Sequence, residues 1–307
     1  MSSKLVLVHA VFPVSLTGNK TFSSLLDKIY AFLDANPSET VIMSVKREGI
    51  GNMTDQQVAR ILHDHYTSSP SHANRWYTTP TIPTLGECRG RIVLMRRLVI
   101  DDTMRGLNNG KGWAIDAECW ADNTSCDYHG DVCVQDFYEV ESSINIEKKI
   151  TYCTEQLQRA ADVVASLPGV TCDAVHPTPA QPFFLNFLTA SNFFRRDVWP
   201  ERVARVVGPR VLGWLCEWHA RRQDEEDDGK EKRGEKFVGD GGCGIVIMDW
   251  VGLQDDWDLA RVVVGWNAKL MMREIDLVGE GELADDNQID ERDLVRDGLE
   301  RPADSSR

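Results

Sequence analysis

The sequence has no apolar run near the roughly 18 residues that a membrane-spanning helix needs. It is also short of positive charge, because 34 Lys and Arg residues stand against 48 Asp and Glu residues, a formal net charge of −14. A protein that tracks nucleic acid phosphates needs a basic surface, so no nucleic acid partner is expected. Eight cysteines in 307 residues, with no CxxC pair, are too few for a disulfide scaffold.

The only cysteine cluster is formed by Cys119, Cys126 and Cys133, with His129 among them. Its spacing differs from that of common structural zinc sites. We therefore expect no metal and no other cofactor.

Half of the net charge lies at the carboxyl end, since residues 273–307 hold 12 acidic and 5 basic side chains, which gives −7 of the total −14. This stretch has few large apolar residues and no aromatic one, which predicts a disordered acidic tail after a single domain of residues 1–272. Residues 221–242 mix both charge signs with glycine and predict an exposed loop within that domain.

The apolar pattern alternates between strands and helices. Strands are predicted at 4–9, 40–46, 91–97, 131–138, 183–188 and 244–250, and helices at 21–36, 54–66, 143–166, 198–222 and 256–272. Gly208-Pro209 should bend or split the fourth helix. Nearly all-apolar strands that alternate with helices indicate a parallel sheet whose outer face is covered by helices.

Six strands are two fewer than a (β/α)8 barrel requires. The chain also enters its first predicted strand at once. We therefore expect an α/β fold, an irregular (β/α)8 TIM-type barrel without its first two β/α units.

Polar side chains gather where the predicted strands end, which is where such barrels carry their chemistry. They are His9, Lys46, Glu48, Arg96, Arg97, Asp136, Tyr138 and Asp249. Cations bind phosphate and carboxylates accept hydrogen bonds from hydroxyls, so the set suits a hydroxyl-rich anion such as a sugar phosphate. Taken singly, Lys46 and Glu48 could form a surface ion pair, Asp249 could cap a helix, and His9 could be structural.

Several segments together resemble the catalytic X domain of phosphatidylinositol-specific phospholipase C, in the single-domain type of bacteria and fungi. They are LVLVHAVFPV, FLDANPSETVIMSVKREG, TLGECRGRIVLMRRL, WADNTSCDYHGDVCVQDFYEV, FFLNFLTAS and GIVIMDW. The resemblance runs from about Lys4 to Trp266. It implies an irregular (β/α)8 barrel that cleaves phosphatidylinositol to diacylglycerol and a cyclic inositol phosphate by histidine general acid/base catalysis.

The same resemblance implies the roles of individual residues. His9 matches the general acid that protonates the leaving diacylglycerol oxygen, and Asp249 matches the carboxylate that orients the general-base histidine. The residues that match the inositol-binding shell are Lys46, Arg97, Asp136 and Tyr138, with Trp120 beside them and Glu48 in the same shell. The family's general-base histidine and phosphate-binding arginine precede the position of His9, and the eight residues before it contain neither.

We therefore expect a phospholipase C-like phosphoric diester hydrolase or lyase, with little turnover by residues 1–307 themselves. The alternative is a non-catalytic barrel that binds inositol lipid or phosphate. A glycerophosphodiester phosphodiesterase would need metal-binding carboxylates near the start, and the sequence has none there. The expected partners are phosphatidylinositol or a related inositol phospholipid, and membranes touched peripherally by a monomer. The compartment is not indicated.

Overall fold

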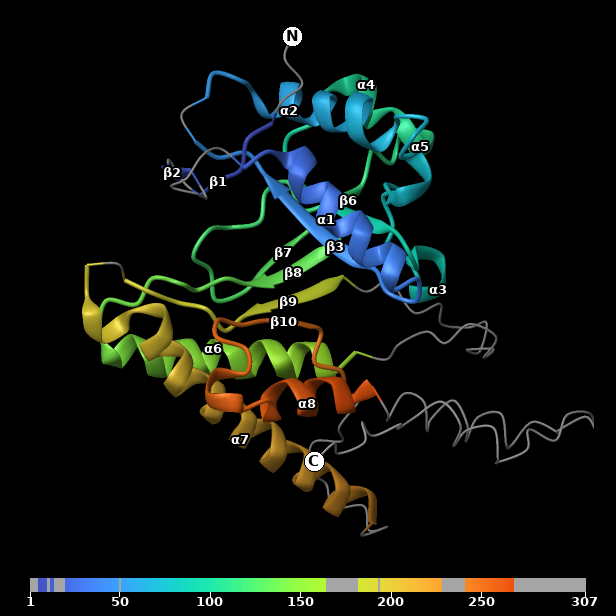
Figure 1. The fold of residues 1–307 in the computed structure, drawn as a ribbon. Coiled ribbons are helices and arrows are strands. Elements are labelled where there is room, and N and C mark those ends of the chain that lie inside the picture. The colour runs from blue at the N-terminus through green and yellow to red at the C-terminus, as the bar shows by residue number, and fades with distance from the viewer. Residues whose placement is uncertain are drawn as a thin grey trace, which may run out of the picture.

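The computed structural model describes residues 5–9, 12–13, 20–49, 51–163, 182–192, 194–227 and 241–267. The chain is mixed α/β, with two sheets lying between two groups of helices (Figure 1). No helix within the described ranges is long and apolar enough to cross a membrane.

The first sheet is built around β5 (Ile92–Arg97). It has β3 (Val41–Lys46) on one side, with β4 (Trp76–Tyr77) and β6 (Ile115–Asp116) on the other, all parallel to β5. Lys46 is level with Arg97, so β3 and β5 end at the same edge. Their outer face packs on helices α1 (Phe22–Ala35) and α2 (Asp55–Ile61) through one apolar cluster.

Both of these helices begin where the sequence predicts. The Thr21 hydroxyl accepts a hydrogen bond from the backbone N–H of Ser24 and caps α1. Thr54 and Gln57 form the predicted capping box of α2. Helix α2 continues into a π-helical segment, η1 (Leu62–Thr67), and the short helices η2 (Ala73–Arg75), α3 (Leu85–Cys88), α4 (Asp102–Arg105) and α5 (Leu107–Gly110) follow.

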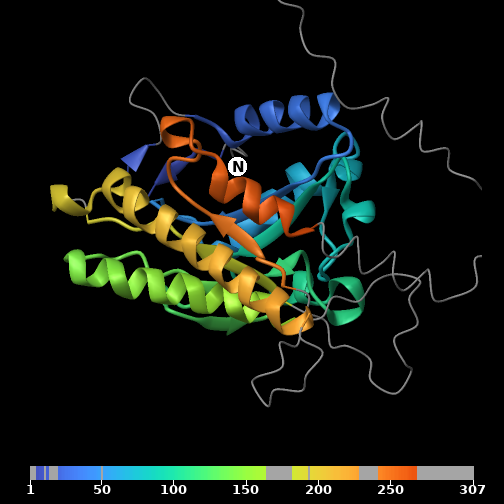
Figure 2. The same ribbon diagram turned by 90° about the horizontal axis from the view of Figure 1, so that it is seen from below.

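The second sheet has three parallel strands, β8 (Val132–Gln135), β9 (Phe183–Phe187) and β10 (Ile245–Ile247), with β7 (Asp127–His129) antiparallel to β8. Its outer face is covered by α6 (Ser143–Ala161), α7 (Pro200–Asp227) and α8 (Asp258–Gly265), which lie side by side (Figure 2). The loops before α7 and α8 contain η3 (Arg196–Val198) and η4 (Leu253–Asp255). The predicted apolar stripe of α6, from Ile146 to Leu157, lies in the cluster between these helices and the sheet.

The two sheets face each other across a shared apolar cluster. It combines Val93 and Met95 of β5 with Val132 and Val134 of β8 and Leu185 of β9. Hydrogen bonds between the described strands nevertheless form two separate sheets and a hairpin, rather than one closed barrel.

The prediction of a buried first strand is wrong. The only strand among the described residues there is Val8–His9 (β1), which pairs antiparallel with Phe12–Pro13 (β2), while Val6 forms a single antiparallel bridge with Thr21. Leu5 and Leu7 are only half-buried, and their backbone hydrogen bonds go to residues 20–22 at the start of α1. Lys4 lies outside the described residues.

Three further boundaries differ from prediction. Helix α7 runs through Pro209 to Asp227, so of the two predicted effects of Gly208-Pro209 the split is wrong, and residues 221–227 of the predicted loop are helical. Strand β8 ends at Gln135, and β10 ends at Ile247, two residues before Asp249. Residues 228–240, the end of the last predicted helix from 268, and the predicted tail 273–307 lie outside the described residues.

Candidate active site

Arg97 is the last residue of β5, and its side chain lies on the interior face of the first sheet. Val93 of the same strand lies in the cluster between the sheets, and residues an even number apart in a strand share a face. Arg96 points the opposite way, and its buried guanidinium lies 2.7 Å from Glu118 and 2.9 Å from Asp116. The expectation that Arg96 adds a cation to the strand-end site is wrong, because strand alternation directs its side chain to the outer face.

Asp136 and Asp249 follow the interior face of the second sheet. Val134 of β8 and Ile247 of β10 pack between the sheets, and each carboxylate comes two residues later. Asp136 is buried and Asp249 is half-buried. Burial raises the pKa of both carboxyl groups, and nearby cations oppose that rise.

Trp120 supports the Arg97 guanidinium. The central guanidinium carbon of Arg97 lies 3.5 Å from the centroid of the Trp120 ring, and Trp120 itself is buried. Burial lowers the pKa of Arg97, and the charge of Asp136 is the largest influence that opposes this shift. Within the described part of the chain, Arg97 forms no ion pair within 4.0 Å, so its hydrogen-bond donors are not committed to a carboxylate.

Tyr138 is held by residues from the loop before β7. Its hydroxyl donates a 2.7 Å hydrogen bond to Asp122, which is the main reason that the pKa of Tyr138 is raised to about 12. The side-chain oxygen of Asn123 accepts from the backbone N–H groups of Tyr138 and Glu139. Asp122 and Asn123 were missed as site residues; the run of turn-forming side chains after Trp120 was the available signal.

The third group lies at the end of β3. Lys46 Nζ lies 3.4 Å from Glu48 Oε1, and His9 Nδ1 lies 3.9 Å from Glu48 Oε2. The His9 side chain is 93% exposed. The structure therefore brings the predicted acid close to the lysine and glutamate, but leaves its ring in solvent.

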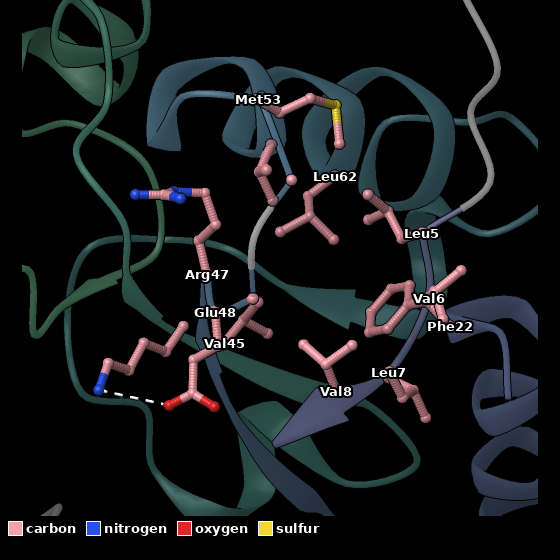
Figure 3. A pocket seen from close by; sticks show the side chains of 14 residues that line it. Leu5, Val6, Leu7, Val8, Phe22, Val45, Arg47, Glu48, Met53 and Leu62 are labelled. Atoms are coloured by element: carbon pink, nitrogen blue, oxygen red, sulfur yellow. Dashed lines mark ion pairs between the residues drawn. The ribbon is translucent and has the colours of Figure 1, made fainter. Parts of the chain in front are cut away.

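A mostly apolar cavity of about 410 Å³ adjoins the Lys46–Glu48 ion pair, which the dashed line in Figure 3 marks. Residues 5–8 line one side, Val45 of β3 another, and Val58 and Leu62 of the helices a third. The cavity therefore lies between residues 5–8 and β3, where the first predicted strand would have paired.

Lys149 of α6 extends from the outer face of the second sheet to the end of β8. The sequence analysis did not predict it as a site residue. Its side chain is 0% exposed, and Nζ donates hydrogen bonds to the Gln135 side-chain oxygen and the Phe137 backbone oxygen. The available signal was its position, since a lysine there falls on the apolar stripe that contains Ile146 and Ile150.

Among the described residues, no histidine forms a hydrogen bond or ion pair with Asp249. In that part of the chain, no three His, Cys, Asp or Glu side chains are grouped so that they could hold a metal ion. The described side chains near these strand ends thus include a histidine, two cations and several carboxylates.

A comparison with protein families identifies the amino-terminal part. Residues 2–98 match the family "Phosphatidylinositol-specific phospholipase C, X domain". The matched X-domain segment contains His9, Lys46, Glu48 and Arg97, and it confirms the resemblance. Asp136, Tyr138 and Asp249 lie beyond the matched residues.

Curated relatives agree with this X-domain match. The 1-phosphatidylinositol phosphodiesterase of Staphylococcus aureus (strain Newman) is 32% identical over 104 residues, which cover 33% of this chain and 31% of that protein. The enzyme of the same name from Listeria monocytogenes is 33% identical over 102 residues, 30% of this chain and 31% of that protein. The chain thus matches less than a third of the length of these relatives.

Solved structures extend the likeness in fold. A crystal structure of phosphatidylinositol-specific phospholipase C from Staphylococcus aureus has a TM-score of 0.55 and 21% identity, over 85% of this chain and 75% of that one. A second, from work on the membrane binding of the S. aureus enzyme, has a TM-score of 0.57 and 20% identity over the same shares. The α/β fold is therefore that of the phosphatidylinositol-specific phospholipase C structures across most of the chain.

Proposed function

We propose that this chain recognises phosphatidylinositol and cleaves it as a phospholipase C, with the site at the carboxyl ends of β3, β5, β8 and β10. The observation that carries the proposal is that charged side chains from three separate strand ends influence one another's pKa. Arg97 and Lys46 oppose the rise in the pKa of Asp136, and Asp136, Glu48 and Tyr138 oppose the fall in the pKa of Arg97. This mutual influence supports a single shared site, which we call the mouth.

The chemistry of this mouth suits an inositol phosphate headgroup. The uncommitted guanidinium of Arg97 can bind phosphate oxygens through two hydrogen bonds, and Lys46 adds a second cation. Asp136 and Glu48 can accept hydrogen bonds from ring hydroxyls, and the Tyr138 phenol can contact the ring. In this proposal Trp120 keeps Arg97 from rotating away.

The reaction would use His9 as general acid. The 2-hydroxyl of inositol attacks phosphorus, the bond from phosphorus to the diacylglycerol oxygen breaks, and His9 gives that oxygen its proton. Asp249 would orient a histidine that removes the proton from the attacking hydroxyl. The described residues place no histidine beside Asp249. We therefore expect residues 1–307 to cleave the lipid about 10²–10⁴-fold more slowly than a chain that has a general base.

In the same proposal, the two sheets are arcs of one incomplete (β/α)8 barrel. Among the described residues, β3 lies at one edge of the first sheet and β10 at one edge of the second, and the cluster between the sheets is of the kind that fills a barrel. Residues 1–272 would form this domain, with residues 273–307 as an acidic tail.

A non-catalytic inositol-lipid-binding protein is the second candidate. It is favoured by Asp249, which has no histidine partner in the described ranges, and by the exposed ring of His9. In this reading the shell of Lys46, Arg97, Asp136 and Tyr138 binds the headgroup without cleaving it.

Membrane contact would occur at the rim of the mouth. Large apolar side chains are exposed in the segments that follow β8, β9 and β10: Ile144, Phe194, Trp199, Trp250, Val251 and Trp257. The segment between β9 and α7 projects at the left of Figure 1. Parallel strands end at one edge, and exposed tryptophans favour the lipid–water interface. We propose that this rim rests on the bilayer while the headgroup enters the mouth.

The test uses purified residues 1–307 and vesicles that contain phosphatidylinositol, compared with phosphatidylcholine vesicles. Sedimentation measures binding, and phosphorus NMR detects the cyclic inositol phosphate. Cleavage that is lost in His9→Ala supports the enzyme, whereas binding without cleavage supports the second candidate. Equal binding to both kinds of vesicle would contradict both readings.

A further inference from the structure

Lys149 is a buried cation with an unusual position. It lies on α6 among apolar side chains, with Ile146, Ile150 and Cys153 on the same helical face. Its side chain is 0% exposed, although lysine is almost never fully buried unless it is paired. None of the ion pairs of the described residues includes Lys149, so the ammonium is held by neutral oxygens only.

The oxygens that hold Lys149 belong to the strand end that carries the proposed site. Nζ donates to the Gln135 side-chain oxygen at 3.1 Å and to the Phe137 backbone oxygen at 2.5 Å. The Phe137 carbonyl lies between Asp136 and Tyr138 in the chain. The ammonium therefore holds the backbone just after β8, from which the side chains of Asp136 and Tyr138 extend.

Gln135 connects this lysine to the neighbouring strand. Its side-chain nitrogen donates to the Asn186 side-chain oxygen at 2.8 Å and to the Phe187 backbone oxygen at 3.0 Å. Asn186 in turn donates to the backbone oxygen of Cys153 at 2.9 Å. Gln135, Asn186 and Lys149 are all 0% exposed, so the network is sealed beneath the mouth.

We propose that Lys149 is a positioning residue for the strand-end site: its ammonium holds the turn between Asp136 and Tyr138 and places a buried positive charge beneath the carboxylates of that site. This proposal rests on the proposed function only for what the site binds, the inositol hydroxyls. The effect of the Lys149 charge on the two carboxylates does not depend on that function.

The charges around the two carboxylates support this assignment. Burial raises the pKa of Asp136, the cations Arg97, Lys149 and Lys46 oppose that rise, and Asp122 adds to it. For Asp249, Lys149 is the one charge among the described residues that opposes the effect of burial on its pKa. Asp249 should therefore respond most strongly to the loss of Lys149.

The charge on Lys149 is itself sensitive to pH. Burial lowers the pKa of Lys149 to about 8, while Cys153, Asp136 and Asp249 act in the opposite direction. Lys149 is thus a cation at neutral pH and becomes neutral as the pH rises through about 8. Above that pH the support for the two carboxylates should weaken.

The test follows the carboxyl carbons of aspartate by carbon NMR in the full chain labelled at aspartate, with Asp136→Asn and Asp249→Asn to assign the signals. In Lys149→Gln, which keeps a donor but removes the charge, both carboxyl groups should take up protons at higher pH than in the unmodified chain. Lys148→Gln is the matched control, because it removes an exposed lysine from the same helix and should leave both titrations unchanged. Unchanged titrations in folded Lys149→Gln would overturn the proposal.

The unmodified chain supplies a second measurement if Lys149→Gln does not fold. The Asp249 carboxyl signal should show a second inflection at the pH where Lys149 titrates, near 8. A flat Asp249 signal through that range would contradict the proposal. Binding of inositol 1-phosphate is measured separately: its absence from the unmodified chain would remove the proposed function and leave the Lys149 titration to decide this inference.

Discussion

At the end of β5, the guanidinium of Arg97 lies over the ring of Trp120, with its central carbon 3.5 Å from the ring centroid. Arg96, the preceding residue, carries the same guanidinium group but is committed to Glu118 and Asp116 on the other face. One strand end thus holds a structural arginine and an uncommitted arginine. We attribute ligand binding to the second.

Replacing Arg97 with lysine should weaken the binding of inositol 1-phosphate about tenfold, although the charge is kept. Lysine lacks the planar fork and loses most of the stacking on Trp120, which together contribute about 1–2 kcal/mol. Isothermal titration calorimetry measures the affinity. Arg261→Lys on the exposed face of α8 is the control and should bind normally; an equal loss in both variants would argue against a specific role for Arg97.

Asp136→Asn should stabilise the folded chain at pH 7 while it weakens headgroup binding. Burial raises the pKa of Asp136 in the folded state, so ionisation costs the folded state more than the unfolded state. This destabilisation is absent below the unfolded-state pKa and grows as the pH rises through the folded-state pKa. Urea unfolding at several pH values should therefore show a gain at neutral pH that disappears in acid.

Asp27→Asn, on the exposed face of α1, is the control for this stability measurement. It should change the free energy of unfolding by less than about 0.5 kcal/mol at any of these pH values. A loss of stability in Asp136→Asn at pH 7 would show that the ion contacts of Asp136 outweigh its burial.

Gly244→Ala should destabilise the fold by about 2 kcal/mol or more. Gly244 has φ +65°, and an added Cβ would lie 2.6 Å from the backbone oxygen of Phe184, where β10 approaches β9. Gly213→Ala makes the same chemical change in helix α7, where nothing lies within 4 Å of the new Cβ. It should stabilise by about 0.5–1 kcal/mol, because alanine favours helix. Urea unfolding of both variants distinguishes strain from a general effect of alanine.

Asp122→Asn should lower the pKa of Tyr138 from about 12 toward the ordinary value, because the hydrogen bond to Asp122 is the largest cause of the shift. Ultraviolet absorbance follows the formation of phenolate, and the difference from Tyr138→Phe isolates the signal. Tyr128 is an internal control, since its pKa is also raised to about 12 but by burial first. A Tyr138 titration that stays near 12 in Asp122→Asn would contradict the assignment.

Local signals in the sequence were sufficient for most of the elements. The caps at Thr21 and Thr54 and the apolar stripe of α6 act within a few residues, so helix starts could be predicted well. The predicted end of the strand at 91–97 was also correct for Arg97, whereas Asp136, predicted within a strand at 131–138, lies one residue beyond β8. The first strand was wrong because an apolar run specifies burial but not a pairing partner, and residues 5–8 are tied instead to the start of α1.

Pro209 shows a second limit of local reasoning. Proline removes one backbone donor, which predicts a break in an isolated helix. In α7, however, Val203, Val207, Val211 and Leu215 are buried against α6 and α8, and this packing spans the proline. A continuous apolar stripe therefore outweighed the lost hydrogen bond.

The amino-acid sequence was sufficient to predict the alternation of helices and strands, the X-domain likeness of residues 2–98, and the polar residues at or just beyond the strand ends. Which of these residues meet depends on the folded structure. Folding turned Arg96 away from the site, brought Asp122 to Tyr138, and placed the buried Lys149 ammonium against the Phe137 backbone oxygen between Asp136 and Tyr138. The physical reason is that hydrogen bonds and buried charges join residues far apart in the chain, and such contacts leave no periodic signal in the sequence.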